Sequence, residues 1–216
     1  MSNKLKIDLH VHTNFSKDGF SSINEIIKYA KNRGIDGIAI TDHDVLINEK
    51  IIEKISNENN IIIIPGIEIT TKYGHLILLK PNNLKNDFEE LLKNEIIIIP
   101  HPLDPFSHGI GKKIIKKILY KKPLLEIRNS STLPIYNKLA ERLANKYELG
   151  VVGGSDAHIA YMVGTSYTIV EVEDKNINEI LDAIKNGKTM AYGGFSLLNI
   201  KFFIEKYFKN RNLFYF

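Results

Sequence analysis

The stretch IDLHVHT, residues 7–13, decides the fold, because it combines the pattern of a strand with two closely spaced histidines. Successive side chains of a strand point to opposite faces, so His10 and His12 project from the same face. Asp8 shares that face, and a carboxylate there can orient a metal-bound histidine from behind. Two imidazoles placed in this way can coordinate one metal ion, although the same spacing also occurs in structural or incidental pairs of histidines. The rest of the chain decides between these interpretations.

Apolar runs of strand length recur along the chain and alternate with stretches of helical pattern. We expect strands at residues 6–10, 37–40, 61–64, 76–79, 96–99, 124–127, 150–152 and 167–170. We expect helices at 21–34, capped by Ser21 or Ser22, at 133–150, and near 47–56 and 177–186. This alternation predicts an α/β fold, either barrel-like or layered.

The length and composition favour one domain. A chain of 216 residues can bury one substantial core, and no linker or repeat interrupts it, so we expect a single domain over residues 1–216. No run of 18 or more apolar residues occurs, and the amino terminus lacks the apolar region of a signal peptide. We therefore expect a cytoplasmic protein without a membrane partner. The chain has no cysteine, so any metal must be held by nitrogen and oxygen ligands.

The net charge of +4 is weak evidence for a nucleic-acid partner, because arginine occurs at only four positions among the 29 basic residues. The densest basic stretch, residues 111–122, places isoleucines and a leucine on one helical face and lysines on the other. We interpret it as a solvated helix face.

Polar residues cluster where the expected strands end. Six of the seven histidines lie at or just after such an end, and His108 is the exception. In parallel α/β folds the loops after the strands form the ligand site, so these side chains should converge. The residues concerned are His10, His12, His43 between Asp42 and Asp44, Glu68, His75, His101, Asp156 and His158.

Five motifs together resemble those of the polymerase and histidinol phosphatase (PHP) domain family. They are DLHVHTNFSKDG, ITDHD, GIEIT, PHP and GGSDAH, so the resemblance spans residues 7–158, and the chain up to Gly194 is similar to the usual end of small members. The resemblance implies a distorted (β/α)7 barrel with two or three divalent ions at the carboxyl ends of the strands.

Carried over to this sequence, the family pattern implies three groups of metal ligands. The first is His10, His12, Glu68 and Asp156, the second is Glu68, His75 and His101, and the third is Asp18, His43 and His158. Every expected position is filled, which indicates an intact enzyme site. Imidazole with carboxylate suits zinc, manganese or iron.

The resemblance implies a metal-dependent phosphoesterase in which a metal-activated hydroxide attacks phosphorus, with Glu68 shared between two ions. We expect a small phosphomonoester, a nucleotide or metabolite phosphate, as substrate. The alternatives are a nuclease or oligonucleotide phosphoesterase and, third, a non-catalytic interaction module.

Some residues keep two interpretations. Arg128 is a candidate phosphate contact or an ion-pair partner of Glu126, and Ser155 is a candidate phosphate contact or a turn residue. His108 is a proton donor or a solvent-facing residue, and the spacing assigns no role to Glu126 or Asn129.

The carboxyl-terminal segment, residues 198–216, is rich in aromatic residues. Such a tail is either packed against the barrel or exposed for a partner. We expect a final helix that closes the barrel bottom, with a homodimer contact as the alternative.

Overall fold

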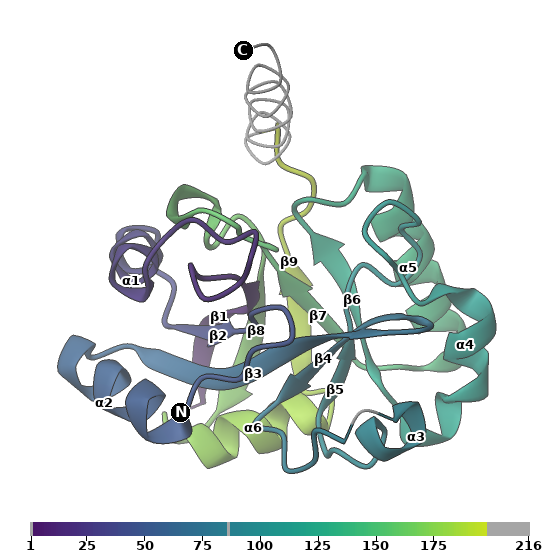
Figure 1. The fold of residues 1–216 in the computed structure, drawn as a ribbon, viewed down its shortest axis with the longest axis horizontal. Helices are drawn as coiled ribbons and strands as arrows, with labels where there is room; N and C mark the ends of the chain where they lie inside the picture. Colours follow the sequence, from purple (N-terminus) through teal and green to yellow (C-terminus); the bar gives the residue numbers. More distant parts are fainter. Residues whose placement is uncertain (1, 86, 198–216) are drawn as a thin grey trace, which may run out of the picture.

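The computed structural model describes residues 2–85 and 87–197, which share one nine-stranded sheet. The strands are β1 (Asn3–Val11), β2 (Gly37–Ile40), β3 (Ile62–Thr71), β4 (Gly74–Leu79), β5 (Ile97–Ile99), β6 (Leu124–Asn129), β7 (Val151–Gly154), β8 (Tyr167–Val172) and β9 (Thr189–Tyr192). The helices are α1 (Ile23–Asn32), α2 (Glu49–Asn59), α3 (Phe88–Leu91), α4 (Gly111–Lys117), α5 (Pro134–Tyr147) and α6 (Ile177–Lys185), with 3₁₀ turns at Leu119–Lys121 and Ala160–Met162. The helices surround the sheet (Figure 1).

The sheet curls into a distorted barrel. Its strand order is β7-β6-β5-β4-β3-β2-β1-β8-β9, and only β4 and β8 run against the other strands. Side chains join β7 to the opposite end of the sheet, because Thr168 Oγ1 donates to the Gly153 carbonyl at 2.8 Å and Thr189 Oγ1 donates to the Val151 carbonyl at 2.7 Å. The predicted α/β barrel is confirmed, and threonine side chains join β7 to β8 and β9, where the two ends of the sheet meet.

The reversed direction of β4 explains one departure from the sequence prediction. His75 precedes the apolar run of its strand, whereas the prediction placed it with residues that follow a strand. Because β4 runs antiparallel to β3, His75 pairs with Thr70 near the carboxyl end of β3. The amino end of β4 therefore lies at the rim where the parallel strands end. Strand β9 and helix α3 were not expected from the sequence.

Local sequence signals set the helix ends. Ser22, rather than Ser21, caps α1, in a capping box with Glu25. The hydroxyl of Ser21 instead accepts the backbone N–H of Ala160 at 2.9 Å. Helix α5 ends before the predicted Gly150, because Glu148 already adopts a left-handed conformation.

The core has three clusters that cover the sheet. One packs α1 and α2 against β1, β2 and β3, and another packs α3, α4 and α5 against β3 to β6. A third joins Ile180 and Ile184 of α6 to residues that include Ile64 and Ile98, which precede the rim on their strands. Helix α6 thus packs toward the amino ends of the strands, where the sequence prediction had placed the aromatic tail. Residues 198–216 lie outside the described part of the chain.

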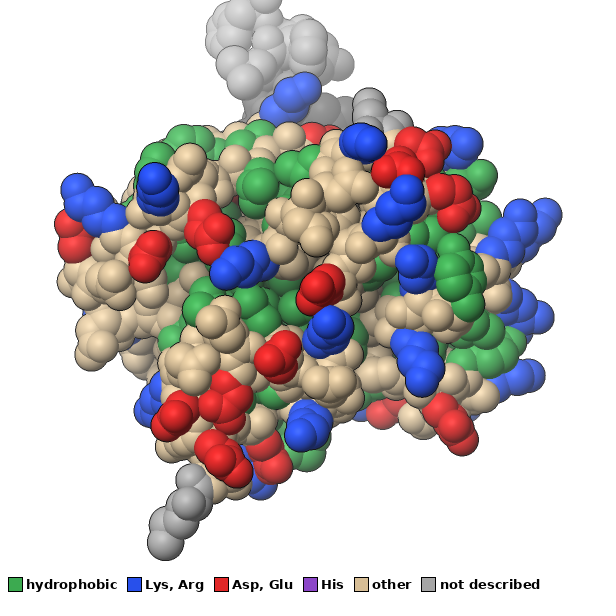
Figure 2. Space-filling view, turned by 90° about the horizontal axis from the view of Figure 1, so that it is seen from below, with side chains coloured by type: hydrophobic (Ala, Val, Ile, Leu, Met, Phe, Trp, Pro, Cys, Tyr) green, Lys and Arg blue, Asp and Glu red, His purple; other side chains and the backbone are tan. Residues whose placement is uncertain are grey.

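The lower side of the molecule differs from the rim. A groove of about 870 Å³ lies at the amino ends of β1, β2 and β3, lined by residues such as Leu5, Asp36 and Ile62. Figure 2 views the molecule from below and shows acidic and basic side chains interspersed, with no histidine of the described residues in view. None of the described helices is both long and apolar enough to cross a membrane.

Candidate metal centre

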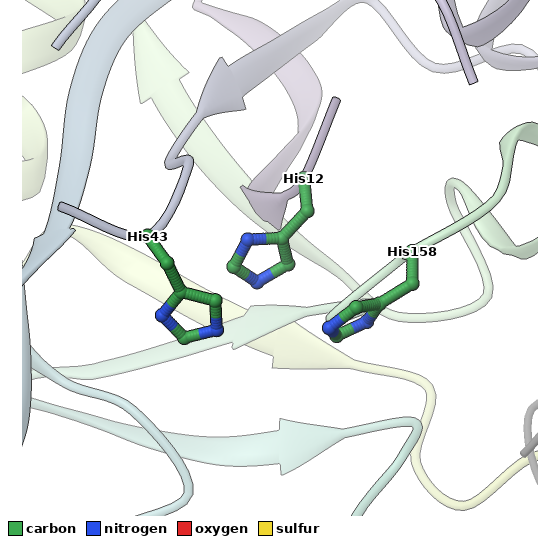
Figure 3. A group of neighbouring side chains, drawn as sticks. All are labelled: His12, His43 and His158. Atoms are coloured by element: carbon green, nitrogen blue, oxygen red, sulfur yellow. The ribbon is translucent and has the colours of Figure 1, made fainter. Parts of the chain in front are cut away.

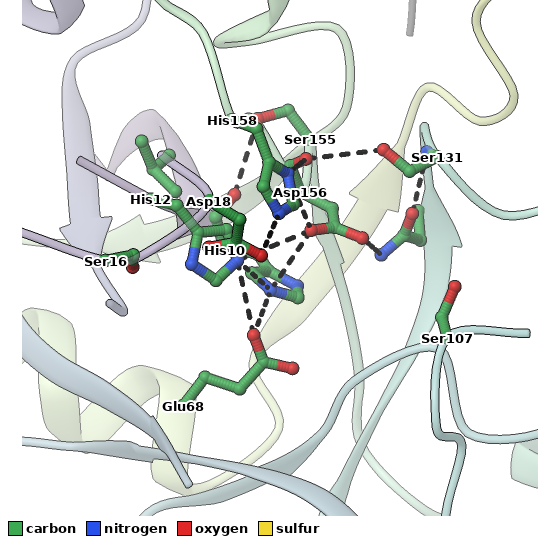
Figure 4. Close-up of polar contacts among 12 residues, drawn as sticks. His10, His12, Ser16, Asp18, Glu68, Ser107, Ser131, Ser155, Asp156 and His158 are labelled. Atoms are coloured by element: carbon green, nitrogen blue, oxygen red, sulfur yellow. Dashed lines mark hydrogen bonds and ion pairs between the residues drawn. The ribbon is translucent and has the colours of Figure 1, made fainter. Parts of the chain in front are cut away.

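The structure brings the nine predicted ligand residues together at one rim of the barrel. Figure 4 shows six of them, from β1, β3 and the loops after β1 and β7, turned toward a common centre. Two of the nine, His101 and Asp156, have positive φ angles of 30° and 54°. Non-glycine residues seldom adopt this conformation, and such strain concentrates at functional sites.

The first group consists of His10, His12, Glu68 and Asp156, all of them buried. Nε2 of His10 lies 3.0 Å from Glu68 Oε2, and Nε2 of His12 lies 3.2 Å from the same oxygen. Asp156 Oδ1 lies 3.5 Å from His10 Nε2 and 3.4 Å from His12 Nε2. Donor atoms about 2.0–2.2 Å from a tetrahedral ion stand about 3.3–3.6 Å apart, close to these separations, so the group fits one ion.

The second group shares Glu68 with the first. Glu68 Oε1, the oxygen that does not face His10 and His12, lies 2.9 Å from His75 Nδ1 and 3.2 Å from His101 Nε2. The buried Nδ1 of His75 has no hydrogen-bond partner in the described chain, despite this short distance. The carboxylate of Glu68 therefore has the geometry of a bridge between two ions.

The third group consists of Asp18, His43 and His158. Asp18 Oδ2 lies 3.2 Å from His158 Nε2 and 3.6 Å from His43 Nε2. His43 and His158 flank His12 in Figure 3, with ring centroids 4.6 Å and 4.5 Å from that of His12. His12 therefore stands at the boundary between the first and third groups.

The electrostatics of the buried cluster fit a cation. Burial alone would raise the pKa of Glu68, but the surrounding histidines, His10 above all, hold it well below its usual range. Burial alone would lower the pKa of His12, but Asp156 and Glu68 outweigh it and raise the pKa to about 9. Buried carboxylates require positive charge close by. Protonated histidines can supply that charge, and a divalent ion at the same place would supply it directly.

Two buried aspartates hold the loops that carry the ligands. Asp8 does not contact an imidazole, as the sequence suggested, but accepts the backbone N–H groups of Ser155 at 2.8 Å and Gly164 at 2.7 Å. Burial raises the pKa of Asp8 to about 6. Asp42 accepts the hydroxyls of Thr13 and Ser16, each at 2.7 Å.

The two candidate phosphate contacts have other partners. Arg128 pairs with Glu141 of α5 at 2.8 Å and not with Glu126. The register between β6 and β7 shifts between Glu126 and Arg128, and such irregularities re-aim side chains. Ser155 is buried, and its hydroxyl lies 3.4 Å from the His10 carbonyl, so the turn interpretation has the better geometry.

Three residues without an assigned role lie beside the ligands. His108 is exposed, and its ring centroid is 5.2 Å from that of His75. Glu126 and Asn129 are buried and hydrogen-bonded to each other at 2.8 Å. The signal that pointed to them was a carboxylate and an amide at the end of an apolar strand, but spacing alone gave no partner.

Comparisons with known proteins agree with this geometry. A sequence model described as PHP-associated matches residues 134–189. The uncharacterized protein MJ0417 of Methanocaldococcus jannaschii is 30% identical over 202 residues, which cover 84% of this chain and 79% of that protein. A protein of Clostridium novyi named as a probable phosphatase is 25% identical over 227 residues, covering 87% and 89% of the two chains. The chain belongs to the PHP family. Relatives that are named as probable phosphatases match most of this chain.

Solved structures share the PHP barrel. A two-domain protein of Bacteroides vulgatus that contains a predicted PHP-like metal-dependent phosphoesterase superimposes with a TM-score of 0.73 at 21% identity. The match covers 89% of this chain and 66% of that one. The lesion-specific endonuclease Q of Pyrococcus furiosus superimposes with a TM-score of 0.64 at 19% identity, over 88% and 58% of the chains. At these identities the likeness concerns the fold.

Proposed function

We propose that this PHP protein hydrolyses small phosphomonoesters, such as a nucleotide or a metabolite phosphate, at the rim of its barrel. The observation that carries the proposal is Glu68, whose two carboxylate oxygens face two separate sets of histidines. Two ions that share a carboxylate stand about 3.5–4 Å apart, the spacing suited to in-line displacement at phosphorus.

The three groups of ligands would hold two or three divalent ions, with zinc, manganese and iron as the candidates for this mixture of imidazole and carboxylate. Bound there, such ions supply Lewis acidity and lower the pKa of a bound water. The protein's own contribution is positional, since buried side chains fix the donor atoms before substrate arrives. No serine, cysteine or lysine is needed as a nucleophile.

The burial gradient indicates where the substrate enters. The side chains of His10, His12 and Glu68 are almost completely buried, whereas that of Asp18 is 34% exposed and that of His43 is 23% exposed. The open side of the centre therefore lies over the third group. A phosphate group entering there meets the third group first, while the ester's remainder stays near solvent.

The discriminating experiment is a phosphate-release screen with zinc-, manganese- or iron-loaded protein and with chelator-treated protein. The panel contains sugar phosphates, mononucleotides and short oligonucleotides. We expect metal-dependent release from one class of small ester. Purified protein that binds less than one metal per chain, or that releases phosphate from no substrate with any of the three metals, would overturn the proposal.

A nuclease activity is the second candidate, since the endonuclease Q of Pyrococcus furiosus has the same fold. The four lysines of α4, Lys112, Lys113, Lys116 and Lys117, are exposed and could attract a phosphate backbone. Salt separates the candidates, because cleavage of nucleic acid falls steeply between 50 and 200 mM salt and hydrolysis of a small ester changes little. Steep salt dependence that disappears in a variant with these four lysines changed to glutamine would favour the nuclease.

A further inference from the structure

Glu126 and Asn129 of β6 stand behind the ligands and outside the three groups. Glu126 Oε1 lies 3.1 Å from His10 Nδ1, the ring nitrogen that faces away from the first group. Glu126 Oε2 accepts the backbone N–H of His101 at 2.8 Å and the side-chain amide of Asn129 at 2.8 Å. One buried carboxylate therefore contacts a ligand of the first group and the backbone of a ligand of the second.

The orientation of Asn129 is determined by its other contacts. Its Oδ1 accepts the N–H groups of Ser131 at 2.8 Å and Thr132 at 3.0 Å, so its amide nitrogen must point the other way. That nitrogen donates to Glu126 and, at 3.3 Å, to Asp156 Oδ2. The side chain of Asn137 from α5 fixes the backbone on both sides, accepting the N–H of Asn129 and donating to its carbonyl.

Glu126 and Asn129 both pack against β7 at Gly154. A Cβ at Gly154 would lie 2.7 Å from Glu126 Oε1 and 2.4 Å from the Cβ of His10. A side chain at this position would collide with the contact between Glu126 and His10. The backbone of β7 therefore leaves room for that contact.

The third group has a different support. Asp42 accepts the Ser16 hydroxyl at 2.7 Å, and the Ser16 oxygen accepts the backbone N–H of His43 at 3.0 Å. Glu126 and Asn129 contact members of the first and second groups, namely His10, His101 and Asp156. Asp42 also accepts the backbone N–H of Thr13 at 2.6 Å, beside His12 of the first group, so Ser16 is the support that belongs to the third group.

We propose that Glu126 and Asn129 form a positioning unit that sets the first and second groups together, whereas Ser16 supports the third group. The inference rests on the proposed function, because it presupposes that ions bind. Glu126 accepts a hydrogen bond from the Nδ1–H of His10. The proton of the ring is thereby held on Nδ1, and the Nε2 lone pair is free for an ion. Asn129 holds Asp156, and the N–H of His101 completes the link to the second group.

The substitution Glu126→Gln tests this role, because a neutral amide cannot accept hydrogen bonds from His10 on one side and from His101 and Asn129 on the other. If the Gln oxygen accepts from His101 and Asn129, its NH₂ faces His10 Nδ1, which must then act as an acceptor. The proton of His10 moves to Nε2, and that nitrogen can no longer bind an ion. If the amide is reversed, its NH₂ faces two other donors.

The test compares zinc retention in the parent protein and in three variants, Glu126→Gln, Asn129→Ala and Ser16→Ala. Each protein is loaded with zinc, dialysed against graded chelator and analysed for bound zinc by elemental analysis. Mutation of a residue that hydrogen-bonds to a metal ligand typically weakens metal affinity about 10–100-fold. We expect Glu126→Gln to lose two zinc equivalents together, about 10–100-fold more easily than the parent, and Asn129→Ala to show the same pattern more weakly. Ser16→Ala, which removes the acceptor of the His43 N–H, should lose at most one equivalent.

The outcomes are distinguishable. A parent that binds no zinc contradicts the proposed function itself. A parent that binds zinc while Glu126→Gln and Asn129→Ala retain it equally well overturns the positioning role. So does the same loss in Ser16→Ala as in Glu126→Gln, since general loosening of the rim would affect every group. The melting temperature of each metal-free variant shows whether it folds, and Asn129→Ala carries the test if Glu126→Gln does not.

Discussion

Gly154→Ala is the most direct perturbation of the packing beneath the metal centre. The added Cβ would lie 2.4 Å from the Cβ of His10, 2.7 Å from Glu126 Oε1 and 2.9 Å from the backbone nitrogen of His10. Backbone and buried groups must shift to relieve contacts this close. Overpacking of this kind costs about 1–3 kcal/mol.

For a chain of this size each kcal/mol lowers the melting temperature by about 2–4 °C, so we expect a loss of about 2–12 °C. The displacement falls on His10 and Glu126, so zinc retention and phosphate release should fall as well. Melting is followed by circular dichroism on metal-free protein, and zinc is measured after dialysis against chelator.

Gly34→Ala is the matched control. A Cβ there meets nothing within 4 Å, but Gly34 has a φ of +65°, so alanine costs about 1–2 kcal/mol through backbone strain alone. It should lose comparable stability and keep its zinc. The reasoning is refuted if Gly154→Ala melts and retains zinc like the parent, or if the two variants lose zinc equally.

Three further outcomes are expected. Asp156→Asn should lower both metal content and rate, because it replaces an anionic carboxylate, whose Oδ1 lies 3.4 Å from His12 Nε2, with a neutral amide. Unchanged values of both would show that the first group is assigned wrongly. The pKa of His12 is raised to about 9, so its contribution to the stability of the metal-free protein is fully present below pH 6.5 and is lost as pH rises to about 9. Zinc must displace that proton, so zinc affinity should rise over the same interval, and thermal melting with and without zinc at several pH values measures both trends. Ser155→Ala should lower the free energy of unfolding by about 1–2 kcal/mol without changing KM for a phosphoester, since the hydroxyl is buried near the His10 carbonyl. A raised KM at unchanged stability would restore the phosphate-contact interpretation.

Much of the fold could be predicted from local signals. Apolar runs of strand length and capping residues such as Ser22 depend on neighbours in the chain, so each predicted strand overlaps an observed one. The candidate ligands could also be identified from the sequence, because a histidine or carboxylate after an apolar run is unusual whatever the position of the strand in the fold. Their role as metal ligands stays a prediction.

The directions of strands and side chains depended on the tertiary structure. His75 reaches the rim only because β4 is reversed, and strand direction is a property of pairing rather than of the run itself. Arg128 turns to α5 while Glu126 turns to His10, through a register shift that no pattern of the sequence reveals.

By itself the sequence determined strands β1 to β8, most of the helices and the candidate metal ligands, because these follow from side-chain chemistry and short-range periodicity. Only the tertiary structure decided which oxygen of Glu68 faces which histidines, and that Glu126 and Asn129 stand behind both groups. The physical reason is that these contacts join strands far apart in the chain, and their geometry exists only once the barrel is closed.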